Sequence, residues 1–216
     1  MPLIRRDAPS APSTPGQDDH RGLLTQGSPD QRWAAARAMT GPADAPLLAA
    51  ALASEADARV RGALLTSLSR CGAAESLDAI LPLLRSDDAS ARTGALDALR
   101  AIPEIVAARL PLLLQDEDAD VRLLACELAR GIPEAQAAAL LVDRLALDPQ
   151  PNVCAAAVEV LAEVGTPEVL PALETCAARF PDEPFLAFAT RAAAPEPGCG
   201  CDPRPGSGAA WLNLTP

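Results

Sequence analysis

Apolar residues recur through most of the chain at the spacing of a helix that buries one face. In three successive segments they fall four, seven and eight residues after a common starting point: Ala95, Ala98 and Leu99; Ala125, Leu128 and Ala129; Ala157, Val160 and Leu161. Residues at these offsets share one side of a helix with 3.6 residues per turn. An acidic or serine-containing turn precedes each segment, and such side chains accept hydrogen bonds from the first free N–H groups of a helix. The pattern predicts amphipathic helices.

A short break and a second apolar stretch follow each of these helices. Cys71-Gly72 is one such break, and Leu77, Ile80 and Leu84 follow it. Glycine can end a helix in the left-handed conformation, and proline, which marks several of the other breaks, can start the next one. We therefore expect a helical hairpin. Pro82 and Pro111 occupy equivalent late positions in their second helices and predict a shared kink there.

The hairpin pattern repeats along the chain. We call the first residue of each first-helix pattern its anchor; the anchors lie 29 to 32 residues apart, at Gln31, Val60, Ala91, Val121 and Val153. Self-similarity at such a period marks a stack of identical supersecondary units. The sequence predicts an all-α fold, an α-solenoid of about five helical hairpins.

The composition of the two ends differs from that of the repeats. Residues 1–27, rich in Pro, Ser, Asp and Gly, are expected to form a flexible leader, residues 28–194 the solenoid, and residues 195–216 a Pro- and Gly-rich flexible tail. The three phenylalanines, Phe180, Phe185 and Phe188, cluster at the end of the solenoid, with Phe185 as the expected anchor of an incomplete last unit. Their clustering predicts a cap that closes the open end of the stack.

The charge balance limits the partners. The formal net charge is -11, and all 18 basic residues are arginines. A protein this acidic would repel a phosphate backbone, so we expect no nucleic-acid partner. No run approaches the ~18 apolar residues of a membrane span, and no signal peptide follows Met1. We expect a cytoplasmic chain that does not bind a membrane.

Each repeat contains, in order, an acidic turn, Val-Arg, alanine at the fourth position after the anchor, a Gly or Pro break and a Leu-rich helix. This order of features resembles the HEAT repeat proteins. The short period is most similar to the branch that includes the phycobilisome lyases. The resemblance implies a concave surface, formed by the second helices, that grips a partner. It also implies a ladder between neighbouring units, for which Asp57 with Arg61, Asp88 with Arg92, and Asp118 or Asp120 with Arg122 fit the pattern. Cys154 and Leu186 replace the arginine in the last two units, where we expect the ladder to stop.

Residues suited to catalysis are scarce in the repeats. The deoxyhypusine hydroxylases of this family hold a di-iron centre with repeated His-Glu pairs, whereas this chain has one histidine, His20, in the expected leader. The repeats therefore lack the usual general base and the commonest metal ligand. We expect a non-enzymatic scaffold or adaptor without a cofactor, which binds a partner protein on the second-helix face.

Helical position suggests which residues of that face are exposed to the partner. These are Ser76, Asp78, Arg109, Gln136, Asp143, Arg144, Glu168 and Glu174.

The cysteines leave an alternative open. Four of the six lie inside helical patterns and are expected to be small buried hydrophobic residues. Cys199 and Cys201, separated by Gly200, could bind a transition metal or an iron–sulfur unit, although a closed site usually needs four ligands. The alternative function is therefore an accessory factor for a cofactor-bearing protein, either similar to a bilin lyase or handling metal through this tail. The nearby segment Ala210-Trp211-Leu212 could dock on a partner or fold back on the stack.

Overall fold

The chain forms a stack of helical hairpins. The computed structural model describes residues 17–164 and 167–193, and within these ranges it contains twelve α-helices, four short 3-10 helices and no strand. Two helices flank the hairpins: α1 (Gln17–Gln26) at one end and α12 (Pro184–Ala193) at the other. The expected α-solenoid is therefore confirmed.

Each hairpin consists of a first helix and a second helix, in some units joined or extended by a 3-10 turn. In order they are α2 (Pro29–Ala38), η1 (Pro42–Asp44) and α3 (Ala45–Leu52); α4 (Ala58–Cys71), α5 (Ala74–Ile80) and η2 (Leu81–Arg85); α6 (Ala89–Arg100) and α7 (Pro103–Leu113); α8 (Ala119–Leu128), η3 (Ala129–Gly131) and α9 (Glu134–Leu147); α10 (Pro151–Val164), η4 (Pro167–Val169) and α11 (Leu170–Arg179).

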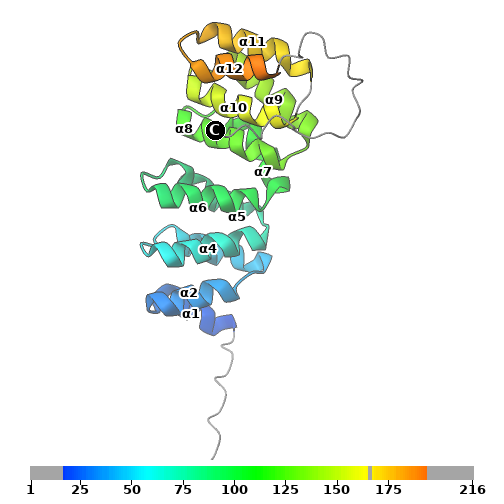
Figure 1. Cartoon of the computed structure of the whole chain (residues 1–216). Coiled ribbons are helices and arrows are strands. Elements are labelled where there is room, and N and C mark those ends of the chain that lie inside the picture. The colour runs from blue at the N-terminus through cyan, green and yellow to red at the C-terminus, as the bar shows by residue number, and fades with distance from the viewer. Residues whose placement is uncertain (1–16, 165–166, 194–216) are drawn as a thin grey trace, which may run out of the picture.

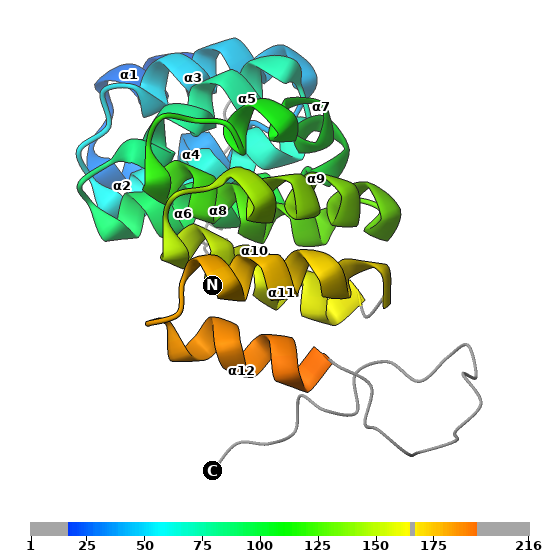
Figure 2. The same ribbon diagram turned by 90° about the horizontal axis from the view of Figure 1, so that it is seen from above.

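The hairpins follow one another along the stack, from α1 and α2 at one end to α11 and α12 at the other (Figure 1). Figure 2 looks along the stack and shows α1, α3, α5 and α7 on one side, with α2, α4, α6 and α8 on the other. First helices therefore pack on first helices of the neighbouring units, and second helices on second helices. We call the solvent-exposed side of the second helices the second-helix face.

Side-chain caps begin the first helices where the sequence places them. Ser28 and Gln31 form a capping box on α2, in which each side chain accepts a hydrogen bond from the other residue's backbone N–H. The carboxylates of Asp57, Asp88 and Asp118 accept from the first N–H groups of α4, α6 and α8. The acidic turns predicted as helix starts are thus confirmed as N-caps.

Two columns of buried residues build the core. The fourth residue after each anchor is at most 1% exposed in all five first helices: Ala35, Leu64, Ala95, Ala125 and Ala157. One large side chain of each second helix, at most 2% exposed, faces this column: Leu48, Ile80, Leu110, Leu141 and Leu173. Small residues predominate in the first column, so the first helices can approach the second ones closely, and burial of both columns supplies the main driving force for the stack.

Two expectations for the helices are corrected. The expected flexible leader contains α1, whose Leu24 is 2% exposed because the helix packs on α2 and α3. The kink expected at both Pro82 and Pro111 is not shared. Pro111 lies inside α7, whereas α5 ends at Ile80 and Pro82 is the second residue of the 3-10 turn η2, where its missing N–H costs no helical bond.

Candidate functional site

A row of arginines joins neighbouring units along the stack. In three units the arginine that follows the anchor reaches an acid in the turn before the next unit: Arg32 binds Glu55 through Nε and Nη2 at 2.8 and 2.9 Å, Arg61 pairs with Asp88, and Arg122 binds Asp148. Arg32 also donates from Nη1 to the Gly27 carbonyl oxygen at 3.0 Å, in the turn before its own helix. Each complete contact of this kind therefore holds two successive turns together.

This geometry corrects the partners expected within the ladder. Asp57, Asp88 and Asp118 cap the helices of their own units, and the hydrogen bonds from the Val60 and Arg59 N–H groups lower the pKa of Asp57. They do not pair with the arginine of the same helix. For Arg32 and Arg122 the acceptor lies five residues before the next anchor, at Glu55 and Asp148.

The same position is variable in the middle units, and the contacts there change accordingly. Ser86 occupies it in the third unit, and Arg61 pairs with Asp88 instead. Asp116 occupies it in the fourth unit but is paired with Arg85 of η2, while Arg92 donates to the Ser86 carbonyl oxygen. Where the acid is missing or already paired, the arginine therefore uses another group of the same turns.

Asp148 is the most buried ionic centre of the described structure. Its side chain is fully buried and accepts from Arg122 Nε at 2.7 Å and Nη2 at 3.1 Å, while Arg144 Nε lies 3.1 Å away. Burial raises the pKa of the Asp148 carboxyl, but the hydrogen bonds from Arg122 and the Gln150 N–H lower it more, so the net pKa is below its ordinary value. Arg122 also binds the carbonyl oxygens of Asp116 and Glu117.

The end of the ladder is supported by a different arginine. Cys154 occupies the arginine position of α10, and its thiol contacts the Asp148 carbonyl oxygen at 3.7 Å. Arg179, at the end of α11, donates to the carbonyl oxygens of Asp148 and Ala146. The turn before α10 is therefore held from the second-helix layer, and not from its own first helix.

The register of α12 corrects the expected last anchor. The Cys154 N–H donates to the Gln150 carbonyl oxygen, as the Ala187 N–H does to that of Glu183. Ala187, and not Leu186, therefore occupies the arginine position of the last unit. Leu186, at 2% exposure, is the buried anchor in place of Phe185.

Six of the eight residues expected to meet a partner are exposed on the second-helix face. They are Asp78 on α5, Arg109 on α7, Gln136 and Asp143 on α9, Glu168 on η4 and Glu174 on α11. The other two are corrections. Ser76 is fully buried, because it lies four residues before the core residue Ile80 and shares its side of α5. The Arg144 side chain is 12% exposed and is held by Asp148 and the Leu114 carbonyl oxygen.

The charges of this face differ in how they are satisfied. Arg109 binds Asp78 across α7 and α5 at 2.8 Å, and Arg85 binds Asp116. Among the described residues, Asp143 and Glu174 make no hydrogen bond or ion pair, and the same holds for the acidic first-turn residue Glu104. The arginines of the face are thus neutralised by this chain, whereas these carboxylates remain available.

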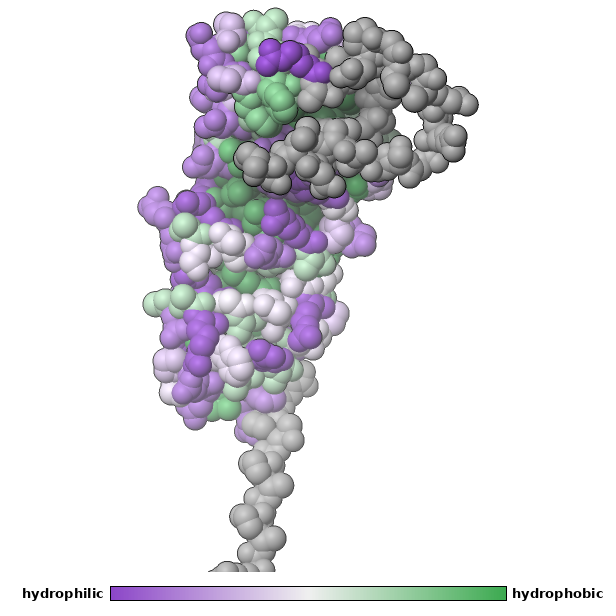
Figure 3. Space-filling view, viewed as in Figure 1, coloured by the Kyte–Doolittle hydropathy of each residue, from purple (hydrophilic) through white to green (hydrophobic). Residues whose placement is uncertain are grey.

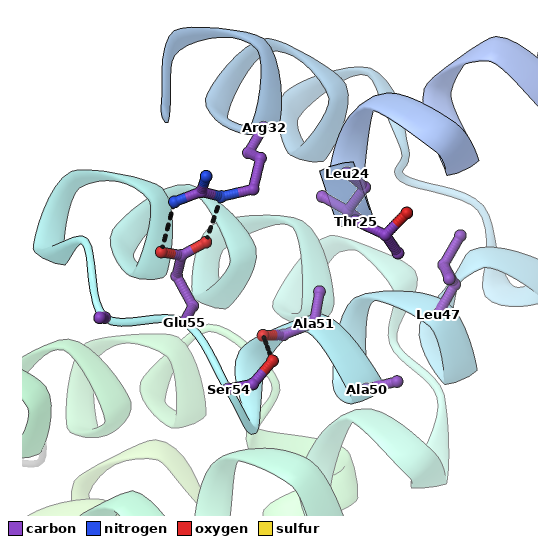
Figure 4. Close-up of a pocket in the computed structure, with 9 residues that line it drawn as sticks. Leu24, Thr25, Arg32, Leu47, Ala50, Ala51, Ser54 and Glu55 are labelled. Carbon is purple, nitrogen blue, oxygen red and sulfur yellow. Dashed lines mark hydrogen bonds and ion pairs between the residues drawn. The ribbon is translucent and has the colours of Figure 1, made fainter. Parts of the chain in front are cut away.

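A recess of about 340 Å³ lies between α1, α3 and the turn after α3. Figure 4 shows Arg32 and Glu55 on one side of it, and Leu24, Thr25 and Leu47 on the other. Because the two charged groups are bound to each other, the recess offers a ligand mainly small apolar side chains.

The four described cysteines are buried in the core. Burial raises the pKa of the Cys126 thiol to about 12 and also raises that of Cys71. A hydrogen bond with Cys176 raises the pKa of Cys154. Cys126 and Cys71 are thus protonated at neutral pH and are poor nucleophiles.

Cys199 and Cys201 lie outside the residues that the structure describes. Within residues 17–164 and 167–193, no three His, Cys, Asp or Glu side chains lie close enough together to hold a metal ion. None of the helices in these ranges is long and apolar enough to span a membrane.

The stacked hairpins define a repeat solenoid, and part of the chain also matches a known repeat family. Residues 106–194 match the sequence model of a family described as HEAT repeats, which confirms the resemblance in this part of the chain. No curated protein sequence matches.

Three solved structures are similar over most of their length. An engineered protein has a TM-score of 0.39 at 18% identity, covering 81% of this chain and 93% of its own. The complex of CpcE and CpcF of phycocyanin lyase from Nostoc sp. PCC7120 has a TM-score of 0.40 at 16% identity, covering 79% and 85%. A designed armadillo repeat protein has a TM-score of 0.38 at 16% identity, covering 82% and 98%.

Proposed function

We propose that the chain is a non-enzymatic scaffold or adaptor that binds a partner protein along its second-helix face. The observation that carries this proposal is that six exposed side chains, predicted from helical position, lie on one face of four successive hairpins. Stacked repeats present extended surfaces of this kind, and binding to them is spread over several units.

The charges of the face favour a partner of one kind. Arg109 and Arg85 are paired within the chain, whereas Asp143, Glu174 and Glu104 have no such contact. A partner surface with arginine or lysine side chains would complement these carboxylates and would associate faster at low ionic strength. Leu112 on α7, 63% exposed, adds an apolar contact on the same layer.

Site-specific photocrosslinking tests the proposal. A photoreactive residue at Gln136 or at Asp143 should trap one protein partner, whereas the same residue at Thr66, exposed on the first-helix layer, should not. Crosslinking that is equally strong from Thr66 would contradict a specific second-helix face.

Charge reversal supplies the matched control. Asp143→Arg with Glu174→Arg should abolish the crosslink, because each change turns a complementary charge into a repulsive one. Asp97→Arg with Glu159→Arg, on exposed positions of α6 and α10, should leave it unchanged. Equal loss with both pairs would indicate a general charge effect and not a binding face.

A further inference from the structure

Two exposed phenylalanines mark the outer surface of α12. Phe185 is 42% and Phe188 60% exposed, whereas Leu186 between them is 2% exposed and faces the core. Figure 3 shows hydrophobic atoms at the α12 end of the visible face, next to hydrophilic ones. The phenylalanine cap expected from the sequence is therefore wrong for these two residues, which are exposed and not buried against the stack. Phe180 alone is partly buried against the core.

The register of the repeats shows that this patch departs from the rest of the chain. Phe185 lies one residue before the anchor of α12. In every other first helix that position is polar and exposed: Asp30, Arg59, Ser90, Asp120 and Asn152. Phe185 stays 42% exposed at this position, so its apolar surface is open to a contact from outside the described helices.

Phe188 lacks a neighbour that its counterpart possesses. It lies two residues after its anchor, as Trp33 does in α2. The Trp33 ring is covered by the guanidinium of Arg59, 5.5 Å away in the next unit, and by Arg37 at 4.7 Å. Within the described residues no unit follows α12, so nothing equivalent to Arg59 covers Phe188.

The size of the patch argues against a second copy as its occupant. An aromatic side chain exposes about 150–250 Å² when free, so the exposed fractions of Phe185 and Phe188 amount to roughly 200 Å². A stable protein–protein interface needs about 800 Å² from each partner. A tethered segment needs much less, because a short linker supplies an effective concentration of about 1 mM.

The chain carries an apolar segment within reach. We propose that residues 209–214, Ala-Ala-Trp-Leu-Asn-Leu, dock on the Phe185 and Phe188 patch and cover the outer surface of α12. The fifteen residues 194–208 that connect them to α12 span up to about 50 Å when extended and about 20 Å on average. Phe188 lies only about 8 Å along the helix from Ala193, at 1.5 Å per residue. The linker therefore allows the contact without strain.

Competition between a free peptide and the tethered segment tests this proposal. A fluorescein-labelled peptide of residues 206–216 is added to the full chain and to a variant ending at Pro205, and fluorescence anisotropy reports binding. If the peptide binds the shortened variant with a Kd of about 100 µM, a tethered copy at about 1 mM should weaken its binding to the full chain about tenfold. Equal binding to both forms, or binding to neither, would overturn the proposal.

Variants locate the surface. Phe188→Ser in the shortened variant should weaken peptide binding at least tenfold, with an unchanged helical circular dichroism spectrum because the side chain is exposed. Leu112→Ser, which removes a similarly exposed leucine on the second-helix layer, should have no effect. Loss of binding with Leu112→Ser instead would contradict the assignment. Self-association of the full chain that Phe188→Ser abolishes would assign the patch to a second copy and would also overturn the proposal.

Discussion

Replacing Asp148 by alanine probes the most buried ionic contact of the stack. The change removes a fully buried carboxylate and leaves the Arg122 side chain, 9% exposed, without its two hydrogen bonds to Asp148. Breaking a buried ion pair by removing one partner costs about 3–5 kcal/mol. Arg122 keeps the carbonyl oxygens of Asp116 and Glu117, so we expect the lower end of this range, about 3 kcal/mol.

This cost should be visible in thermal unfolding. For a chain of this size 1 kcal/mol corresponds to about 2–4 °C, so the Tm of Asp148→Ala should fall by about 6–12 °C at pH 7. Circular dichroism at 222 nm measures it. Asp30→Ala is the matched control, because Asp30 also pairs with an arginine but is 84% exposed. Its Tm should change by no more than about 2 °C.

A double variant separates the unpaired charge from the lost packing. If the buried guanidinium is the main cost, Arg122→Met with Asp148→Ala should be more stable than Asp148→Ala alone. A Tm change below about 3 °C for Asp148→Ala, or a double variant less stable than the single one, would refute the reasoning.

Three further predictions concern pH, two glycines and the tail. The folded pKa values of Asp148, Glu55, Asp57 and Asp88 lie below their ordinary values, so the stability they add is complete above about pH 5 and is lost as the pH falls further. The Tm should therefore drop between pH 5 and pH 2, and less so for Asp148→Asn. Gly72→Ala should destabilise the chain by about 1 kcal/mol, because Gly72 ends α4 at φ 59°. Gly62→Ala inside α4, where an added Cβ meets no atom, should instead stabilise it by about 0.5–1 kcal/mol. Urea unfolding measures both changes, and a free-energy change of the same sign for both variants would contradict the conformational argument. Under the scaffold proposal, Cys199→Ser with Cys201→Ser should leave partner crosslinking unchanged, and stoichiometric metal in the purified chain that this double variant loses, measured by mass spectrometry, would support the metal-handling alternative.

Local patterns were sufficient to predict the helices and their core. The fourth position after each anchor and one large apolar residue of each second helix are buried as their spacing predicts. The helix α1 was missed, because its sequence offers only Leu23 and Leu24 as apolar residues and a helix this short depends on packing against α2.

The errors within the site arise from contacts between units. Asp57, Asp88 and Asp118 stand where an acid could either cap a helix or pair with an arginine. The sequence cannot decide between these two roles, because the cap depends on neighbouring residues whereas the pair depends on another unit. The true acceptors Glu55 and Asp148 share a signal that could have identified them, an acid five residues before the anchor. Ser76 could have been recognised as buried from its spacing to Ile80. Arg144 could not, because its carbonyl partner belongs to the previous unit.

Arg32 and Arg122 each contact two successive turns, and this sets the size of the module that can be duplicated. A duplication that runs from one anchor to the next carries one arginine and one acceptor, so the new unit can satisfy both neighbours at once. An insertion of half a unit between Arg122 and Asp148 would separate the donor from its acceptor and break the two hydrogen bonds between them. Lengthening this chain by whole periods of about thirty residues should therefore preserve its fold. Insertions of part of a period should not, even if their sequences form helices equally well.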